Sequence, residues 1–146
     1  MSSESPSRLA DFLCFAIYSA NLTFGKAYKP ILDELGLTYT QFITLVALHE
    51  EGGQTVGGLG EKLFLESNTL TPILKKLESQ GYVTRQRDSA DERQVRVSLT
   101  EAGHALREKA FSASLATACD LTPDEFAATR DAVLKLRNNL ARSLGK

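Results

Sequence analysis

The stretch ESNTLTPILKKLESQGYVTRQRDSADERQVRVSLT, residues 66–100, decides the fold of this chain. It opens with small hydrogen-bonding side chains and continues with apolar residues at helical spacing. This pattern predicts a helix over 67–80, which ends because Gly81 follows it. Two runs of alternating residues, 82–87 and 94–99, come next and predict short strands on either side of a polar loop.

A helix that begins with hydroxyl side chains and precedes a basic two-stranded ribbon is typical of a winged helix-turn-helix, whose helix enters the major groove of DNA. Ser and Thr can bond either kind of base partner, Asn suits adenine, and cations one turn later contact phosphates. The predicted DNA-binding residues are Ser67, Asn68, Thr69, Thr71, Pro72, Lys75, Lys76, Arg85, Arg87 and Arg93. Taken singly, these hydroxyls are equally consistent with helix caps and the arginines with a solvated surface.

Positive charge gathers in this part of the chain. The 146 residues carry a formal net charge of -1, whereas residues 67–98 hold six basic and four acidic side chains, a net of +2. The rest of the chain therefore carries -3, and this polarity suits a protein with one edge that faces DNA. The composition, with 42% hydrophobic and 24% charged residues, is that of an ordinary globular domain.

Amphipathic patterns upstream predict the helices that would support this DNA-reading segment. Pro30 interrupts the first pattern, and Thr38 or Thr40 can cap the helix that follows Gly36. Thr55 can cap the next helix, although three glycines weaken it. The expected upstream helices are 8–28, 31–35, 41–51 and 56–65.

Two more helices are expected downstream, the first over 101–118 and the second capped by Thr122 with Glu125 in a capping box. Apolar stripes on the helices at both chain ends suggest a dimerisation layer. The predicted fold is thus mainly α with a small β-wing, in a single domain, 1–146. The parts of that domain are dimerisation helices at 8–36 and 101–146 and a winged helix-turn-helix at 37–100.

Several other classes of protein find little support in the sequence. The chain has no apolar run long enough to cross a membrane and no signal-peptide pattern, so a cytoplasmic protein is expected. No catalytic triad order, phosphate loop or paired-carboxylate motif stands out, so neither an enzyme nor a cofactor is expected. His49 and His104, with Cys14 and Cys119, lack metal-ligand spacing, so no metal site is expected.

The two cysteines have two possible interpretations. By spacing alone, Cys14 and Cys119 are best explained as small core hydrophobes. However, Tyr18 and Tyr28 lie about 40° to either side of Cys14 on a helix, with Tyr28 about 21 Å along the axis. Tyr28 of an antiparallel partner could therefore reach Cys14, where a phenol hydroxyl would favour the reactive thiolate.

The run TVGGLGEKLFLESNTLTPILKKLESQGYVTRQRDSADERQVRVSLTEAG, residues 55–103, resembles the core of the MarR family of bacterial winged-helix regulators. Asp91-Glu92-Arg93, followed by residues 95–100, resembles that family's wing signature. The resemblance implies a homodimer on pseudo-palindromic operator DNA, with recognition helices about 34 Å apart. It also implies that Arg93 contacts DNA at the wing tip, held by Asp91. Gly58 departs from the pattern, since an acid there would complete a capping box.

Within that family, the chain resembles the organic hydroperoxide resistance regulators. Cys14 matches their peroxidatic cysteine, Tyr28 and Tyr39 the two tyrosines that bond it, Tyr18 a further tyrosine nearby, and Cys119 the resolving cysteine of the two-cysteine branch. The resemblance implies a repressor that an organic hydroperoxide induces. Oxidation of Cys14 to sulfenic acid and an intersubunit disulfide with Cys119 would release the DNA.

Two alternatives remain open at this stage. A MarR-type repressor released by an apolar or phenolic ligand would share the fold and keep its cysteines as structural residues. A thiol peroxidase would need the reactive cysteine pair but neither the basic wing nor the hydroxyl-led helix, so the sequence disfavours it.

Overall fold

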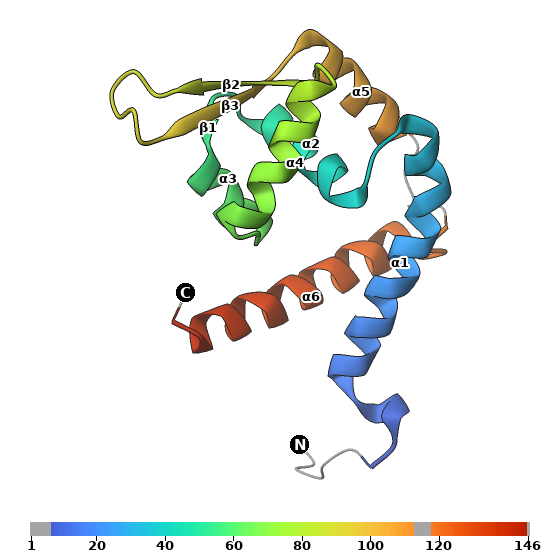
Figure 1. Cartoon of the computed structure of the whole chain (residues 1–146). Coiled ribbons are helices and arrows are strands. Elements are labelled where there is room, and N and C mark those ends of the chain that lie inside the picture. Colours follow the sequence, from blue (N-terminus) through green and yellow to red (C-terminus); the bar gives the residue numbers. More distant parts are fainter. Residues whose placement is uncertain (1–6, 113–117, 146) are drawn as a thin grey trace. The chain divides into compact units, whose positions relative to one another are not determined.

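The computed structural model describes residues 7–112 and 118–145 and divides the chain into two compact units, Met1–Ala113 and Ser114–Lys146 (Figure 1). The second unit contains α6 (Pro123–Ser143). The first unit contains, in chain order, η1 (Leu9–Asp11), α1 (Leu13–Leu35), α2 (Tyr39–Glu50), β1 (Gln54–Thr55), α3 (Val56–Leu63), α4 (Ser67–Ser79), β2 (Val83–Arg87), β3 (Val95–Leu99) and α5 (Glu101–Ser112).

The strands form one antiparallel sheet in the order β1-β3-β2. β2 and β3 pair along their whole length, from Val83 opposite Leu99 to Arg87 opposite Val95, which confirms the predicted hairpin. The hairpin extends past α3 and α4 as a wing, so the first unit has the expected winged helix-turn-helix architecture (Figure 1). β1 was not predicted, because a strand of two residues carries no alternating pattern.

The core of the first unit lies between its helices and the sheet. One stripe of α4 is completely buried, since Leu70, Leu74 and Leu77 have no exposed surface. Burial of a large aliphatic side chain contributes about 1.5–3 kcal/mol, so this stripe fixes the rotation of α4 about its own axis. Other side chains in the same buried cluster include Leu45, Leu48, Leu59, Val83 and Val97.

Threonine side chains cap three helices, as the sequence predicts. Thr38 and Thr122 each form a full capping box with the residue three positions later. Thr55 accepts a hydrogen bond from the N–H of Gly58 at 3.0 Å, with no acidic side chain to complete the box. Each such cap contributes about 1 kcal/mol.

The predicted break at Pro30 is wrong, because α1 continues through it to Leu35. A proline inside a helix removes one hydrogen bond and costs about 3 kcal/mol. The turn beyond it is nevertheless held, because Leu32 is buried and its carbonyl accepts the N–H of Leu37 at 3.0 Å. The burial of Leu32 and this hydrogen bond at the end of the helix therefore offset the energetic cost of Pro30.

Other helix boundaries differ from the prediction. α1 begins at Leu13 and not at residue 8, because Phe12 is extended and separates it from the short 3-10 helix η1. α3 ends at Leu63, two residues earlier than expected. α2 begins at Tyr39, two residues earlier than expected. The helix predicted over 101–118 begins as expected at Glu101 and is described as far as Ser112; residues 113–117 of that range lie outside the described part of the chain.

Large apolar side chains remain exposed on α1 and, in the other unit, on α6. They are Leu13, Phe15, Ile17, Tyr18, Leu22 and Phe24 on α1, and Phe126, Val133 and Leu140 on α6. Within the described ranges no single helix has the length and hydropathy of a membrane span. The bent pair α1 and α2, at 74° to each other, meets that criterion by length and composition only.

We expect Gly103→Ala to lower the free energy of unfolding by about 2 kcal/mol, a typical cost of overpacking. A Cβ at this position would lie 2.1 Å from the carbonyl oxygen of Tyr82, a backbone atom that cannot rotate away. Urea denaturation measures the effect. Gly57→Ala is the matched control, because its Cβ would meet nothing within 4 Å and its free energy of unfolding should change by less than about 1 kcal/mol. Equal stability of the two variants would contradict this close approach.

Candidate nucleic-acid interface and thiol site

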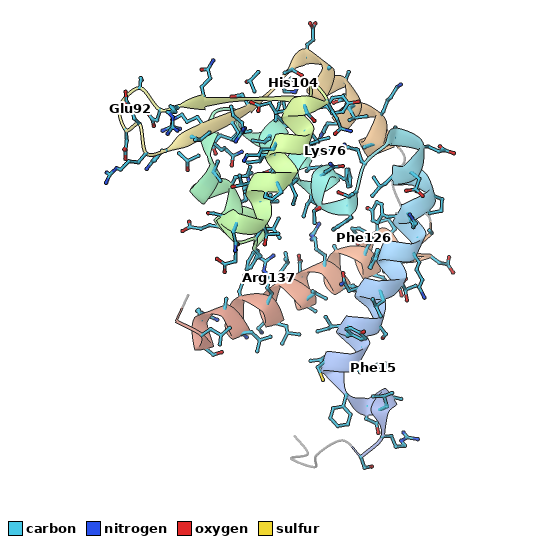
Figure 2. The ribbon with its side chains drawn as sticks, viewed as in Figure 1. Phe15, Lys76, Glu92, His104, Phe126 and Arg137 are labelled. Atoms are coloured by element: carbon cyan, nitrogen blue, oxygen red, sulfur yellow. The ribbon has the colours of Figure 1, made fainter. Side chains whose placement is uncertain are left out.

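The side of α4 opposite its buried stripe carries most of the predicted DNA-binding residues. Lys75 and Lys76 are exposed there, one turn after the polar start of the helix, and form no ion pair among the described residues. Figure 2 labels Lys76 on this helix. Asn68, Thr69 and Pro72 also lie on this exposed side, while Ser67 is exposed because it is the first residue of the helix. α4 thus presents hydroxyl, amide and ammonium groups to the exterior on a helix of fixed orientation.

The first turns of α4 have an unusual hydrogen-bond arrangement. The helix starts at Ser67 with Pro72 in its second turn, as predicted, and its N-cap Glu66 makes no side-chain capping bond. The hydroxyl of Thr71 donates to the carbonyl of Ser67 at 2.8 Å. Because that donor is engaged inside the helix, Thr71 can offer an incoming base only its acceptor lone pairs.

A hollow of about 350 Å³ lies between the start of α4, the start of α3 and the wing. Ser67 and Thr71 line it from α4, Arg85 and Arg93 from the wing, and Gly57 from α3. The structure therefore brings four of the predicted DNA-binding residues around one concave surface.

The arginines of the wing differ in how firmly they are held. Arg85 is paired with Glu78 of α4 at 3.0 Å and is only partly exposed. Arg87 donates to the carbonyl of Glu92 at 2.9 Å, near the wing tip that Figure 2 labels. Arg93 has a side chain that is 91% exposed, and Asp91 accepts from it at 3.1 Å. The wing tip thus holds an accessible cation in a defined place.

A further ion pair, where β2 ends and the wing loop begins, lies outside the predicted site. Arg96 Nε donates to Asp88 Oδ2 at 2.9 Å, and the N–H of Ala90 donates to Asp88 Oδ1 at 2.8 Å. The Ala90 N–H, and then the Arg96 guanidinium, hold the pKa of the Asp88 carboxyl below its ordinary value. Asp88 therefore stays ionised at neutral pH. Asp88 and Arg96 come together because of the register in which β2 and β3 pair. The alternating sequence pattern predicts the two strands but not that register.

Cys14 lies on the first turn of α1 and is an exposed free thiol. It lines a shallow, almost wholly apolar hollow of about 410 Å³ together with Leu9, Phe12, Phe15 and Tyr18. Phe15 projects from this end of α1, and its ring centroid is 6.4 Å from that of Tyr18 (Figure 2). The predicted proximity of Cys14 and Tyr18 is therefore present within one chain.

Tyr28 and Tyr39 come together at the other end of α1. Their ring centroids are 5.5 Å apart, and Phe42 lies 5.8 Å from Tyr28 in the same cluster. Tyr28 lies fourteen positions after Cys14 on α1, which corresponds to about 21 Å along the axis. The structure therefore pairs the two tyrosines with each other and not with Cys14 of the same chain. Cys119 belongs to the other unit, where it is a half-buried free thiol.

Two histidines that the sequence separates by 55 residues lie side by side. His49 Nδ1 at the end of α2 is 3.1 Å from His104 Nδ1 of α5. No third His, Cys, Asp or Glu completes a metal-binding group in the part of the chain that the structure describes.

Comparisons with known proteins support the same interpretation. Residues 26–109 match the family model described as transcriptional regulator SarA/Rot. The organic hydroperoxide resistance transcriptional regulator of Bacillus subtilis (strain 168) is 48% identical over 103 residues, which are 70% of each chain. These matches confirm the resemblance that the sequence motifs indicate.

Solved structures place the fold in the same group. Reduced AbfR bound to DNA superposes with a TM-score of 0.79 at 37% identity, over 94% of this chain and 95% of that one; AbfR comes from Staphylococcus epidermidis. AbfR is also known overoxidised on DNA and in a disulfide-formed state. The apo MarR of E. coli gives a TM-score of 0.71 at 26% identity, over 86% of this chain and 96% of that one. The chain therefore belongs to the SarA/Rot and MarR-type family of winged-helix proteins, which are DNA-binding transcription regulators and not enzymes.

Proposed function

We propose that this chain is a homodimeric repressor that binds pseudo-palindromic operator DNA and releases it when an organic hydroperoxide oxidises Cys14. α4 would enter the major groove with its hydroxyl-led start at the base edges, while Lys75 and Lys76 contact phosphates. Arg93, positioned by Asp91, would reach the backbone or the neighbouring minor groove. The relative named for organic hydroperoxide resistance, and AbfR bound to DNA, support this assignment.

The exposed apolar side chains support the dimer. A monomeric protein rarely leaves a large contiguous apolar patch in water, and here α1 and α6 each carry exposed large apolar residues. A second copy of the chain would cover both. We accordingly assign 8–36 and 101–146 to dimerisation and 37–100 to DNA reading, within a single functional domain of residues 1–146.

The proposed oxidation of Cys14 and the disulfide that follows require the hydroperoxide as the only oxidant. The Cys14 thiolate attacks the terminal oxygen of the hydroperoxide, the O–O bond breaks, and the products are Cys14 sulfenic acid and an alcohol, with one proton taken up. The thiol of Cys119 in the partner subunit then attacks the sulfenic sulfur, which forms a disulfide and releases water. Tyr18, with the partner's Tyr28 and Tyr39, would donate hydrogen bonds to the reacting sulfur.

The observation that carries this proposal is the location of Cys14. A cysteine that served only the core of its own chain would be buried, whereas Cys14 is exposed beside Tyr18 in an apolar hollow. Tyr28 and Tyr39 are already together, yet about 21 Å from that sulfur along α1. A second copy in antiparallel contact is the simplest way to complete the site.

We expect Arg93→Ala to weaken DNA binding roughly tenfold and to reduce the salt slope of binding by about two, one for each subunit. The measurement is fluorescence anisotropy at several salt concentrations, with a duplex that the wild-type protein selects from a random-sequence pool. Lys135→Ala, an exposed cation of α6, is the control and should leave the slope unchanged. An unchanged slope for Arg93→Ala would exclude a phosphate contact at the wing tip.

Cumene hydroperoxide should release the wild-type protein from the same duplex, and dithiothreitol should restore binding. The Cys14→Ser variant should stay bound to the duplex when cumene hydroperoxide is added. Cys119→Ser should form a sulfenic acid that dimedone traps, without a disulfide-linked dimer on non-reducing gels. If Cys14→Ser still released DNA with an apolar or phenolic ligand while wild type ignored the peroxide, the ligand-released repressor would replace this proposal.

Cys14 should react faster with cumene hydroperoxide than with hydrogen peroxide, because Leu9, Phe12 and Phe15 surround it with apolar surface. Burial of even half of the aromatic oxidant would favour its reaction by roughly tenfold. Stopped-flow competition for the thiol in the Cys119→Ser variant compares the two rates. Equal rates would show that the apolar hollow does not select the oxidant.

A further inference from the structure

Arg96 lies on the opposite face of the sheet from Arg85 and Arg87, the arginines of β2. Residues directly opposite each other in an antiparallel pair share a face, and neighbours along a strand alternate. Arg85 is opposite the buried Val97 and contacts α4 through Glu78, so its face packs towards α4. Arg96 is opposite Gln86 and therefore lies on the other face.

On that face Arg96 joins two separate segments of the first unit. Its Nε donates to Asp88 at the end of β2, and its Nη1 donates to the carbonyl of Gly53 at 2.6 Å. Gly53 is held from its other side too, because its N–H donates to Ser98 Oγ of β3 at 2.9 Å. We call the contacts of Arg96 with Asp88 and Gly53 the wing clamp.

The chemistry of the wing clamp depends on an arginine. A guanidinium presents several N–H donors in a rigid planar fork, so one side chain can bond the carboxylate and the carbonyl together. A lysine ammonium on its flexible stem carries the same charge without that geometry. Only 10% of the Asp88 side chain is exposed, so its carboxylate depends on these donors rather than on water.

We infer that Arg96 is a positioning residue, which holds the start of the wing loop, residues 88–94, against the turn between α2 and β1 so that the wing tip is ordered before DNA arrives. Arg93 lies three residues from Arg96 along the hairpin. Ordering the wing in the free protein removes part of the entropy cost of binding. The effect on DNA rests on the proposed function, whereas the ordering of the wing does not.

Two substitutions at Arg96 separate positioning from a direct phosphate contact. A positioning role predicts that Arg96→Lys and Arg96→Ala both weaken binding to the selected duplex roughly fivefold, with the salt slope unchanged. A phosphate contact predicts instead that the lysine variant binds like wild type and that the alanine variant loses about two from the slope. Wild-type affinity in both variants would also overturn the inference. Arg130→Lys, which alters an exposed ion pair on α6, is the matched control.

A measurement on the free protein tests the clamp without DNA. The ¹⁵N heteronuclear NOE of residues 89–93 should fall in Arg96→Lys and in Asp88→Asn, and stay at the wild-type value in Arg130→Lys. Unchanged NOE values in both wing variants would overturn the clamp whatever the DNA results are. If wild type selects no duplex, the proposed function fails, while this measurement still decides whether Arg96 orders the wing.

Discussion

The burial of one stripe of α4 is the interaction on which the rest of the structure depends. Leu70, Leu74 and Leu77 have no exposed surface, and together they contribute several kcal/mol of hydrophobic stabilisation. Because these three side chains fix the rotation of the helix, the polar residues between them must face outward. The orientation of the proposed DNA-reading face of α4 is therefore a consequence of core packing.

The wing is held by apolar contacts on its inner face and by polar contacts around its loop. Its inner face packs on the core through Val83 and Val97, while ion pairs hold the start and the tip of its loop. An exposed ion pair contributes little to stability. The pair at Asp88 differs because the carboxylate is largely shielded and accepts bonds from two donors. The wing thus combines an accessible cation at its tip with a loop that is held where it begins.

The sequence predicts features that repeat along the chain and misses features that depend on tertiary contacts. The apolar periodicity of α4, the alternation of residues in the two wing strands and the threonine caps all follow from local sequence patterns. The predicted helix break at Pro30 is wrong because the burial of Leu32 offsets the energetic cost of a proline inside a helix, and this burial depends on tertiary packing. The same holds for the contact of His49 with His104, whose partners the sequence places 55 residues apart. Candidate cysteines and tyrosines came mainly from family resemblance, since spacing alone favoured core cysteines.

α2 is the element that contacts both the tyrosine cluster and the wing. Its first residue, Tyr39, packs on Tyr28, and the turn after its last residue contains Gly53, which the wing clamp holds. Its twelve residues form a stiff rod about 18 Å long. Under the proposed function, a displacement of its first turn would reach Gly53 and, through the wing clamp, the wing. Under that function, a misalignment of the wing that cost about 1.4 kcal/mol would weaken DNA binding about tenfold.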